Sequence, residues 1–446
     1  MNQARVIQVI GAGLAGCEAA LQLADRGYPV ELWEMRPEAM TPAHQTGDPA
    51  ELVCSNSLKS EAPGSAPYLL KEELRRLGSR LLQAADRCRV PAGQALAVDR
   101  RLFSRHVADA LAARPHIRLV RQEARRIPDT RPVILATGPL TSDTLAAHLQ
   151  TEGSGAHLYF YDAISPVIAW DSLDFSVAWA ASRYGKGGDD YINCPLDRPA
   201  YLAFYEALVG AEEYPLRDFE QAIYFEGCLP IEELARRGVD TLRFGPMKPV
   251  GLVDPRTGRE PYAAVQLRRE SLLTDACNMV GFQNHLRFGE QRRVFRLIPG
   301  LQRAEFVRYG QMHRNTYLNA PRLLTPALEF RARPGLFIAG QLCGLEGYVE
   351  AIATGLLASL QVHRRLQDLP PLLFPRQTAL GSLQHFLEHA DPEDYQPVNM
   401  TFSLLPPPPP ELKRRFRKKS DRNARRVEQI LQDFEKFIHA ADLTVS

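Results

Sequence analysis

The stretch that decides the fold opens the chain and reads Arg5-Val-Ile-Gln-Val-Ile-Gly-Ala-Gly-Leu-Ala-Gly16. A short β-branched run ends in three glycines spaced Gly-x-Gly-x-x-Gly, a helical pattern follows over residues 17–26, and a second strand is expected over residues 29–34. This order of strand, glycine turn, helix and strand is the setting of a dinucleotide-binding fingerprint. Glu34 follows Gly16 by 18 residues, at the end of the second strand, where an acid that binds a ribose is expected.

The glycine turn predicts contact with a pyrophosphate. Glycines let the backbone turn sharply and approach phosphates, and the helix N-terminus adds N–H groups and the positive end of its dipole. A turn without a ligand is the alternative, and the acid at residue 34 favours the nucleotide. FAD fits better than NAD, because later segments supply contacts for a long ligand and no second glycine fingerprint exists. The predicted FAD-binding residues are Gly11, Ala12, Gly13, Leu14, Ala15, Gly16, Glu34, Gly138, Gly340 and Gln341.

Two later runs repeat the pattern of a strand followed by glycine, over residues 132–138 and 335–340. Both are continuously apolar, which is typical of strands buried on both faces of a parallel sheet. The sequence therefore predicts an α/β protein whose nucleotide-binding domain is built from residues 1–165 and 332–405. Residues 166–331 are interpreted as an inserted α+β domain, with candidate strands over 176–184, 262–267 and 306–309 and helices over 200–213 and 231–237. Residues 406–446 form a proline-rich linker and a basic helical tail, helical from residue 421 to 441.

Composition excludes several classes of protein. With 446 residues, 45% hydrophobic and 24% charged, the chain matches a globular protein of about three domains and not a disordered one. No apolar run is long enough to span a membrane, and the N-terminus does not read as a signal peptide. Seven scattered cysteines, without a Cys-x-x-Cys pair, predict free thiols in a reducing cytoplasm, no disulfide scaffold and no metal site.

Two of the cysteines have a context that suggests chemistry. Cys228 directly precedes an expected helix that begins near Pro230, where the helix dipole lowers the pKa of a thiol, and Gly227 gives a ligand room to approach. Cys54 lies in a polar loop after the second strand, with Lys59 nearby. The alternative for each is a small loop residue without a role. Cys17 is expected to lie on the inward-facing side of a helix and pack against the core. The other four cysteines (Cys88, Cys194, Cys277 and Cys343) are interpreted as structural.

Long ordered motifs then identify a resemblance. They include Val9-Ile-Gly-Ala-Gly-Leu-Ala-Gly-Cys-Glu-Ala-Ala20, Glu34-Met-Arg-Pro37, Leu52-Val-Cys-Ser-Asn-Ser-Leu-Lys-Ser60, Ala92-Gly-Gln-Ala-Leu-Ala-Val-Asp-Arg100, Tyr224-Phe-Glu-Gly-Cys-Leu-Pro-Ile-Glu232, Leu242-Arg-Phe-Gly-Pro-Met-Lys-Pro-Val-Gly251, Met312-His-Arg-Asn-Thr316, Gly344-Leu-Glu-Gly-Tyr-Val-Glu350 and Tyr395-Gln-Pro-Val-Asn-Met400. Together they cover essentially the whole chain, which resembles the folate- and FAD-dependent tRNA uracil-5 methyltransferases. The basic tail with its five prolines is longer and more charged than the family pattern.

The resemblance implies a glutathione-reductase-like, Rossmann-type FAD domain with an insertion. It also implies methylation of the T-loop uridine of tRNA to ribothymidine, with 5,10-methylenetetrahydrofolate as carbon donor and NAD(P)H as reductant. Both thiols fall in family motifs: Cys228 is expected to add to uracil C6, and Cys54 to assist removal of the C5 proton or to shield Cys228, although the reverse assignment stays open. His313, Arg314 and Tyr348 are expected to line the folate pocket; a surface pair and a packed helix start are the alternative.

Other functions stay open at this stage. The related FAD-dependent family that modifies the wobble uridine carries a large C-terminal domain for which this chain has no room. A tRNA chaperone with a vestigial flavin and a disulfide reductase are further alternatives, and the lack of paired cysteines disfavours the reductase.

For tRNA contact the candidate is the segment from residue 411 to 426, which holds nine Lys or Arg against two acids, although the whole chain carries only +2. A solvated helix end is the alternative there. Arginine pairs in the inserted domain are alternative contacts: Arg236, Arg237, Arg268, Arg269, Arg292 and Arg293.

Overall fold

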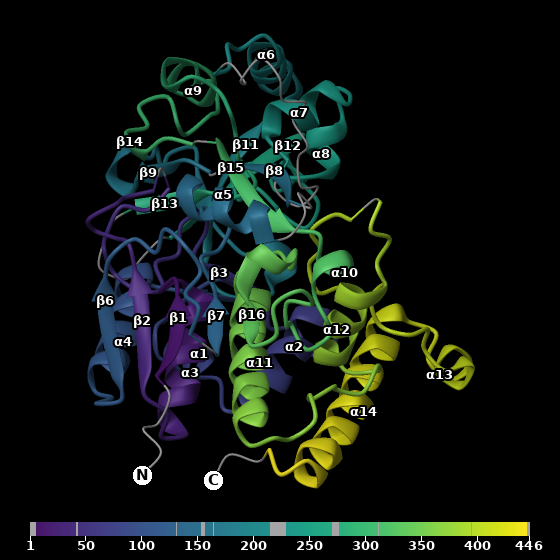
Figure 1. Cartoon of the computed structure of the whole chain (residues 1–446). Helices are drawn as coiled ribbons and strands as arrows, with labels where there is room; N and C mark the ends of the chain where they lie inside the picture. Colours follow the sequence, from purple (N-terminus) through teal and green to yellow (C-terminus); the bar gives the residue numbers. More distant parts are fainter. Residues whose placement is uncertain are drawn as a thin grey trace.

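The computed structural model describes residues 6–41, 43–130, 132–152, 157–163, 165–214, 229–269, 276–310, 312–393 and 395–443. Among these residues the hydrophobic side chains form two large cores. One core joins the early and late parts of the chain, and the other lies entirely between Ile168 and Phe306. The parallel sheet lies below the inserted sheet in Figure 1, so the two layers stack along the long axis of the molecule.

The first core surrounds a five-stranded parallel sheet with the order β16-β7-β1-β2-β6. Its strands are β1 (Ile7–Ile10), β2 (Val30–Glu34), β6 (Ile117–Arg121), β7 (Val133–Leu135) and β16 (Leu336–Ile338). All three residues of β7 and of β16 are buried, as expected for strands covered on both faces of a parallel sheet. The late strand β16 thus completes a sheet that the first residues of the chain begin, as the sequence predicted.

Two helices cover this sheet and pack tightly against each other. Helix α1 (Leu14–Asp25) follows the glycine turn, and α11 (Tyr348–Leu366) follows β16 after a short 3₁₀ turn, η4 (Gly340–Cys343). A Cβ added at Gly355 would lie 2.2 Å from the carbonyl oxygen of Ala15, so glycine permits this close approach. The N-termini of both helices lie at the carboxyl ends of the parallel strands, where ligands bind in open α/β sheets.

A smaller antiparallel sheet and three helices complete the first part of this domain. The sheet has the order β3-β5-β4, formed by β3 (Ser57–Ser60), β4 (Arg89–Val90) and β5 (Ala95–Val98). The helices are α2 (Ala66–Arg76), α3 (Arg80–Arg87) and α4 (Arg100–Ala112). Each helix is capped by a residue whose side chain accepts a backbone N–H bond from the first turn. These capping residues are Ser65, Ser79 and Asp99, respectively. Helix α5 (Asp143–Glu152) follows β7.

The inserted region is built on a six-stranded sheet with the order β10-β11-β12-β13-β9-β14. Its strands are β9 (Val167–Ala169), β10 (Trp179–Ala180), β11 (Tyr191–Leu196), β12 (Ala263–Arg269), β13 (Ala276–Met279) and β14 (Phe306–Arg308). The helices are α6 (Arg198–Val209), α7 (Ile231–Arg236), α8 (Thr241–Phe244) and α9 (Phe288–Phe295). A separate pair, β8 (His157–Ala163) and β15 (Met312–Leu318), lies where the chain enters and leaves this region. The domain boundaries at residues 165 and 331 stay a prediction, and the first core also takes in residues that precede 331, namely Tyr317, Leu318, Ala320, Leu324, Leu328 and Phe330.

One expected strand of this region is much shorter than predicted. Only Trp179 and Ala180 of residues 176–184 pair with a neighbouring strand. At one end the Asp174 carboxylate accepts bonds from Ser176, and at the other Tyr184 has a positive φ of 58° within a 3₁₀ turn, η2 (Arg183–Gly185). Turn chemistry at both ends therefore limits the strand.

The C-terminal segment begins as a projection and ends inside the first core. Pro410 starts helix α13 (Pro410–Arg415) instead of ending a polyproline stretch, and α13 stands away from the body (Figure 1). Helix α14 (Lys419–Ala440) then lies along α2 and buries its apolar face, formed by Val427, Ile430, Leu431, Phe434 and Ile438. A short helix α10 (Ala320–Leu323) contacts α12 (Ala379–His389), which in turn contacts α2. None of the helices described is long and apolar enough to cross a membrane.

Candidate functional site

The glycine turn fits a phosphate-binding role in its local geometry. Gly11 has a φ of 100°, and a Cβ there would lie 2.5 Å from the carbonyl oxygen of Ala136 on the neighbouring strand end, so only glycine fits. At Gly13 a Cβ would meet nothing within 4 Å, so the middle glycine faces open space. Open space directly before the N-terminus of α1 is where an anion approaches a helix.

Glu34 is a buried carboxylate at the end of β2 and is held in one orientation. Its Oε2 accepts bonds from the Ala12 N–H at 3.1 Å and from Arg36 Nη2 at 3.1 Å, and its Oε1 accepts from Arg36 Nε at 2.9 Å. Burial alone raises the pKa of Glu34, but the bonds and charge of Arg36 outweigh it and hold the pKa below 4.5. The carboxylate is therefore ionised and tied to the glycine turn.

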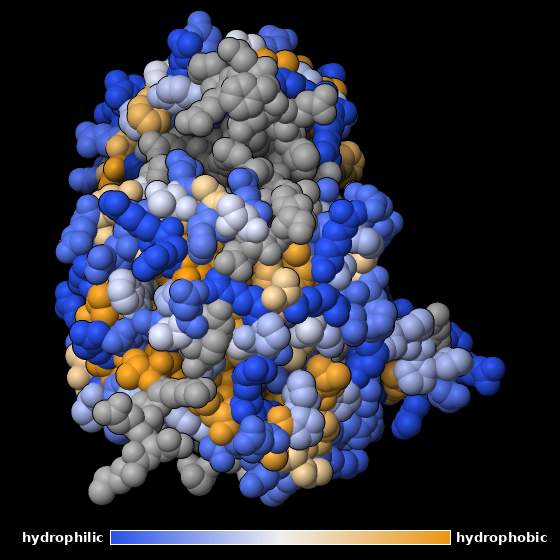
Figure 2. All heavy atoms as spheres, viewed as in Figure 1, coloured by the Kyte–Doolittle hydropathy of each residue, from blue (hydrophilic) through white to orange (hydrophobic). Residues whose placement is uncertain are grey.

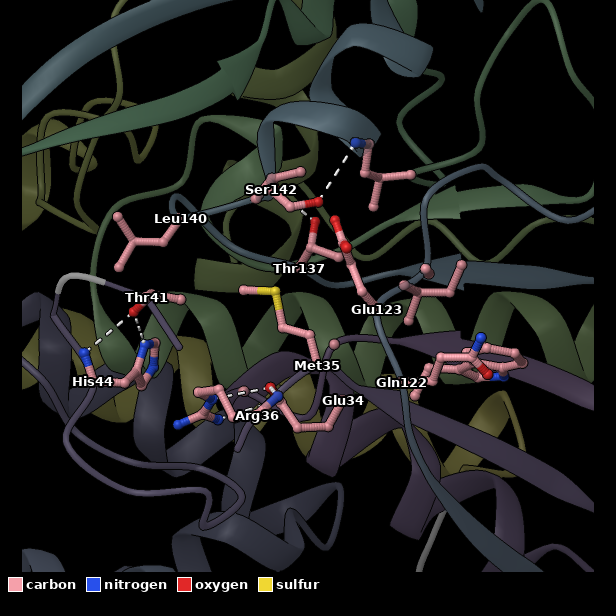
Figure 3. Close-up of a pocket in the computed structure, with 17 residues that line it drawn as sticks. Glu34, Met35, Arg36, Thr41, His44, Gln122, Glu123, Thr137, Leu140 and Ser142 are labelled. Atoms are coloured by element: carbon pink, nitrogen blue, oxygen red, sulfur yellow. Dashed lines mark hydrogen bonds and ion pairs between the residues drawn. The ribbon is translucent and has the colours of Figure 1, made fainter. Parts of the chain in front are cut away.

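A pocket with about 550 Å³ of empty space opens beside Glu34 and the glycine turn (Figure 3). Its walls come from the ends of β1, β2, β6 and β7 and from the loops after them. The lining residues include Gly11, Gly13, Trp33, Glu34, Met35, Arg36, Thr41, His44, Gln122, Thr137 and Leu140. Thr41 and His44 hydrogen bond to each other at 2.6 Å on one wall. The mixture of apolar side chains with a few fixed polar groups is typical of a nucleotide pocket.

Two other predicted FAD contacts lie at neighbouring strand ends. Gly138 follows β7 with a φ of 68°, and Gly340 follows β16 with a φ of 77°. The Gly340 N–H donates to Thr354 Oγ1 at 2.7 Å, and a Cβ there would lie 3.2 Å from the Cβ of Ala15 in α1. Gln341 is half-buried and donates to the Glu346 carboxylate. The structure thus brings the late segment against the glycine turn, as an extended ligand across the sheet edge requires.

Cys54 meets Tyr348 although 294 residues separate them in the sequence. The Cys54 Sγ lies 3.0 Å from the Tyr348 hydroxyl oxygen, which also accepts the N–H groups of Cys54 at 2.9 Å and Ser55 at 3.2 Å. Burial first, and then the Cys54 charge, raise the pKa of Tyr348 well above 10. With two N–H groups on its oxygen, the neutral phenol has its proton free to donate to the sulfur.

The Cys54 loop is also held by arginines from two other segments. Arg100, at the start of α4, donates to the carbonyl oxygens of Leu52 at 2.9 Å and Val53 at 3.2 Å. Arg308, at the end of β14 in the inserted region, donates to the Val53 carbonyl at 3.2 Å. Neither arginine was singled out from the sequence. Both donate to backbone carbonyl oxygens, and such a contact leaves no pattern of residue types in the sequence. The loop therefore depends on how the two regions pack.

Lys59 is a further residue of the same neighbourhood that the sequence analysis left without a role. Its Nζ lies 2.8 Å from the Glu350 carboxylate and 2.5 Å from Asn399 Oδ1. Glu350 is buried in the first turn of α11 and also accepts the Met400 N–H at 2.8 Å. These contacts fasten the segment after Cys54, the start of α11 and the residues before the tail to one another.

The environment of the remaining described cysteines differs from that of Cys54. Cys17, Cys88, Cys194, Cys277 and Cys343 are buried, whereas Cys54 is half-buried. Burial raises the pKa of Cys194 and Cys343 to about 12 and of Cys88 to about 11, and that of Cys17 also rises. Protonated thiols without access are inert, so the interpretation of these residues as packing residues agrees with their surroundings.

The remaining predicted site residues are Cys228, His313 and Arg314. Cys228 lies outside the described residues, which resume at Leu229 directly before α7. His313 and Arg314 lie on the backbone of β15, opposite Asp162 and Tyr161 of β8. Strand β15 lies against η4, and the Thr316 N–H donates to the Pro139 carbonyl at 2.8 Å, so this strand passes the carboxyl ends of β7 and β16.

The basic residues that the sequence suggested for tRNA contact differ in their burial and in their acidic partners. Arg268 is buried and donates to Asn56 at 2.9 Å, which excludes it from a surface patch. Arg236 pairs with Glu213 and Glu233. In the tail, Arg426 is buried against Pro406, whereas Arg414, Arg415, Arg417 and Lys418 in and after α13 are exposed, and Figure 2 shows this projection as mostly hydrophilic.

Comparisons with known proteins agree on one family. The family model described as GIDA, Glucose inhibited division protein A, matches residues 6–370. Two relatives bear the name methylenetetrahydrofolate–tRNA-(uracil-5-)-methyltransferase TrmFO. The one from Koribacter versatilis is 53% identical over 438 residues, covering 98% of this chain and 99% of its own. The one from Solibacter usitatus is 56% identical over 439 residues, covering 97% and 99%.

A solved structure shows the same fold at lower identity. GidA from Aquifex aeolicus superposes with a TM-score of 0.69 and 16% identity, over 96% of this chain and 73% of that one. The predicted fold class is thereby confirmed: a nucleotide-binding α/β protein with an inserted α+β region, of the GIDA type. At about half of all positions identical over nearly the full length, the chain belongs to the family of methylenetetrahydrofolate–tRNA-(uracil-5-)-methyltransferases.

Proposed function

We propose that this chain methylates the T-loop uridine of tRNA at C5, giving ribothymidine. 5,10-Methylenetetrahydrofolate is the carbon donor, FAD is the cofactor and NAD(P)H is the reductant. The observation that carries the proposal is the similarity to named methyltransferases, with about half of all positions identical over nearly the full length. A nucleotide pocket and a half-buried thiol in one domain support it. The reaction belongs in the cytoplasm, where tRNA is made and matured.

The residues of the pocket fit FAD. Gly11 to Gly16 and the N-terminus of α1 would receive the pyrophosphate, because Gly13 leaves open space there. Glu34 would hold the ribose, oriented beforehand by Arg36. Gly138, Gly340 and Gln341 would line the path toward the flavin. When bound, FAD supplies the hydride that turns the transferred one-carbon unit into a methyl group.

The thiols supply the covalent part of the reaction. Uracil C5 is a weak nucleophile until a thiolate adds to C6, which moves the ring electrons onto O4 and makes C5 reactive. Cys228 is the proposed nucleophile, and Cys54 the group that receives the C5 proton after the new carbon bond has formed. Breaking the bond between Cys228 and C6 then restores the ring double bond and frees the product.

Tyr348 has two proposed roles in this site. Its hydroxyl, 3.0 Å from Cys54 Sγ, would donate to the sulfur and so favour the thiolate that accepts a proton. Its ring, with His313 and Arg314, would line the folate pocket: an aromatic or imidazole face for the pterin and a cation for the glutamate. Tyr348→Phe separates these roles, since it keeps the ring and removes only the hydroxyl.

The decisive test of the proposed function is transfer of labelled carbon from methylenetetrahydrofolate to tRNA. Purified holoenzyme with NADPH and an unmodified tRNA transcript should incorporate label at the T-loop uridine. A matched transcript with cytidine at that position should take up none. Label at the wobble uridine, or none on any tRNA despite a bound flavin that NADPH bleaches, would contradict the proposal and favour one of the alternative functions.

A second part of the proposal concerns how tRNA is held. The exposed cations around α13, which include Arg414, Arg415, Arg417 and Lys418, would contact phosphates. Arg426 is excluded from this role because it is buried against the protein. A projecting basic helix suits a large polyanion that cannot enter a pocket.

A further inference from the structure

Four aromatic rings form a continuous row at one edge of the inserted sheet: Phe288 begins α9, Phe306 begins β14, Tyr309 directly follows β14, and Tyr214 comes from the segment after α6. The rings of Phe288 and Tyr309 stack at 4.8 Å with 16° between their planes, and those of Tyr309 and Phe306 stack at 5.2 Å with 15°. Tyr214 meets the edge of Phe288 at 5.6 Å. Helix α9 and strand β14 both lie at the outside of the upper layer in Figure 1.

This row is accessible from solvent, unlike the other aromatic residues around it. Tyr214 is 40% exposed, and Phe288, Phe306 and Tyr309 are half-buried. Phe282 and Phe295, which pack behind the row, are fully buried. Large aromatic side chains that pack on a core and are still partly exposed to solvent are typical of a surface that binds a ligand or a partner molecule.

The row is embedded in positive charge. Residues 287–310 contain six arginines and two glutamates, a surplus of four positive charges in a chain whose net charge is +2. Arg292 donates to the Tyr309 hydroxyl at 2.7 Å, and within the described part of the chain it has no carboxylate partner. Its neighbour Arg293 is instead neutralised by Glu290. Arg292 therefore presents an uncompensated guanidinium beside the stacked rings.

The row also borders the candidate site. Arg308 lies between Phe306 and Tyr309 along the same segment and holds the Cys54 loop through the Val53 carbonyl. Tyr214 lies fourteen residues before Cys228 in the sequence. A ligand on these rings would thus lie next to the loop that carries one thiol and at the start of the segment that carries the other.

We propose that the strip formed by Tyr214, Phe288, Tyr309, Phe306 and Arg292 binds unpaired nucleobases of the tRNA loop that contains the target uridine. Single-stranded RNA is recognised by aromatic faces and guanidinium planes that receive unstacked bases. A uridine must leave the base stack of its loop before a thiol can reach C6. The strip replaces that lost stacking for the neighbouring bases, while Arg292 contacts their phosphates. This inference rests on the proposed tRNA substrate.

The test measures binding of an isolated T-arm stem–loop by the FAD-loaded enzyme. Tyr309→Ala should weaken binding about fivefold or more, which is the smallest loss expected when one base loses its aromatic partner. Tyr309→Phe keeps the ring and should bind nearly as well as the parent. Phe244→Ala is the matched control, because Phe244 is 81% exposed in the same domain and lies on α8, outside the strip. Bound FAD per chain reports whether each variant is folded.

The RNA itself gives a second measurement that does not depend on one variant. A blunt duplex with the same stem should bind the parent and Tyr309→Ala equally, because paired bases cannot stack on the strip. Stem–loops with single abasic positions should identify a loop base whose removal weakens the parent but not Tyr309→Ala. Should Tyr309→Ala lose its FAD, Arg292→Ala replaces it and should reduce stem–loop binding and its salt dependence together.

Three results would overturn the inference. Equal loss of stem–loop and duplex binding would mean that the strip contacts only backbone phosphates. Unchanged stem–loop affinity in folded Tyr309→Ala and Arg292→Ala would leave the surface for a protein partner. A loss in Phe244→Ala alone would place the RNA at α8. Each is distinguishable from failure of the proposed function, in which the parent enzyme itself transfers no label to tRNA.

Discussion

The two ends of the candidate site are built in different ways. At the nucleotide end, the glycine turn, Glu34 and Arg36 all lie within the first 36 residues, and their contacts join neighbouring strand ends. At the thiol end, Cys54 is held by Tyr348, Arg100 and Arg308, which come from three distant segments, the last of them in the inserted region. The nucleotide end therefore depends on local backbone geometry, whereas the thiol end depends on how the two regions pack.

The largest effect is expected from Gly13→Asp at the nucleotide end. The new carboxylate would occupy the open space before α1 and oppose the phosphates, so the variant should purify without FAD. The absorbance of the flavin per chain measures this directly, and Gly289→Asp, at another open glycine, is the control. A yellow Gly13→Asp protein at full stoichiometry would show that the pyrophosphate binds elsewhere.

The next effect concerns stability and its pH dependence. In Glu34→Gln the buried Arg36 loses a charged partner, which should cost about 3 kcal/mol of unfolding free energy at neutral pH. Because folding lowers the pKa of Glu34, its contribution is complete above pH 4.5 and declines as the pH falls through the lower, folded value. Urea unfolding should therefore show the gap between the two proteins closing below pH 4.5.

The exposed Glu38→Gln should show no such gap, which makes it the matched control. A gap between parent and Glu34→Gln that widens in acid would contradict the assigned direction of the pKa shift.

These two predictions concern the part of the molecule that the sequence alone describes well. The first strand, the turn, the second strand and Glu34 follow from a short β-branched run, glycine spacing and an acid at the expected distance. The sequence does not predict that Arg36 donates to both carboxylate oxygens of Glu34. The two residues are only two positions apart at the end of a strand, and a salt bridge at that spacing leaves no periodic pattern in the sequence. The strand over residues 176–184 was overestimated for the opposite reason, because propensity hid the turns at its ends.

The thiol end shows where sequence reasoning stops. Cys54 was singled out through its polar loop and its family motif, and Tyr348 was placed near the folate, not on the sulfur. Contacts across about 300 residues arise from packing, so no local pattern encodes them. The tail is a similar case: its charge is evident from the sequence, but the face of α14 that enters the core is set by its partners α2 and Phe374.

A smaller effect, on catalysis only, is expected at the thiol end. Tyr348→Phe should lower the rate of methyl transfer about tenfold by removing one hydrogen bond to Cys54. FAD content and the KM for methylenetetrahydrofolate should stay unchanged, because the ring remains. The pH profile of kcat should shift to higher pH, as expected for a thiolate that has lost a donor. An unchanged profile together with a raised KM would mean that the hydroxyl serves the folate and not Cys54.

The smallest effect belongs to the tail. Replacing Arg414, Arg415 and Arg417 together by Gln should weaken tRNA binding several-fold and flatten its dependence on salt. Substitution is preferable to deletion, since removing α14 would expose Phe434 and its neighbours in the first core. Neutralising the exposed Arg87, Arg101 and Arg105 on and beside α3 and α4 is the control. Equal salt slopes in the two triple variants would remove the tail from the tRNA interface.

The most direct test of the central claim is covalent trapping with tRNA that carries 5-fluorouridine at the target position. The fluorine at C5 cannot leave as a proton, so the bond between the nucleophilic sulfur and C6 persists and the complex survives denaturing electrophoresis. The account predicts a trapped complex with the parent and with Cys54→Ala, and none with Cys228→Ala. A complex that forms with Cys228→Ala and disappears with Cys54→Ala would contradict it and reverse the roles of the two thiols.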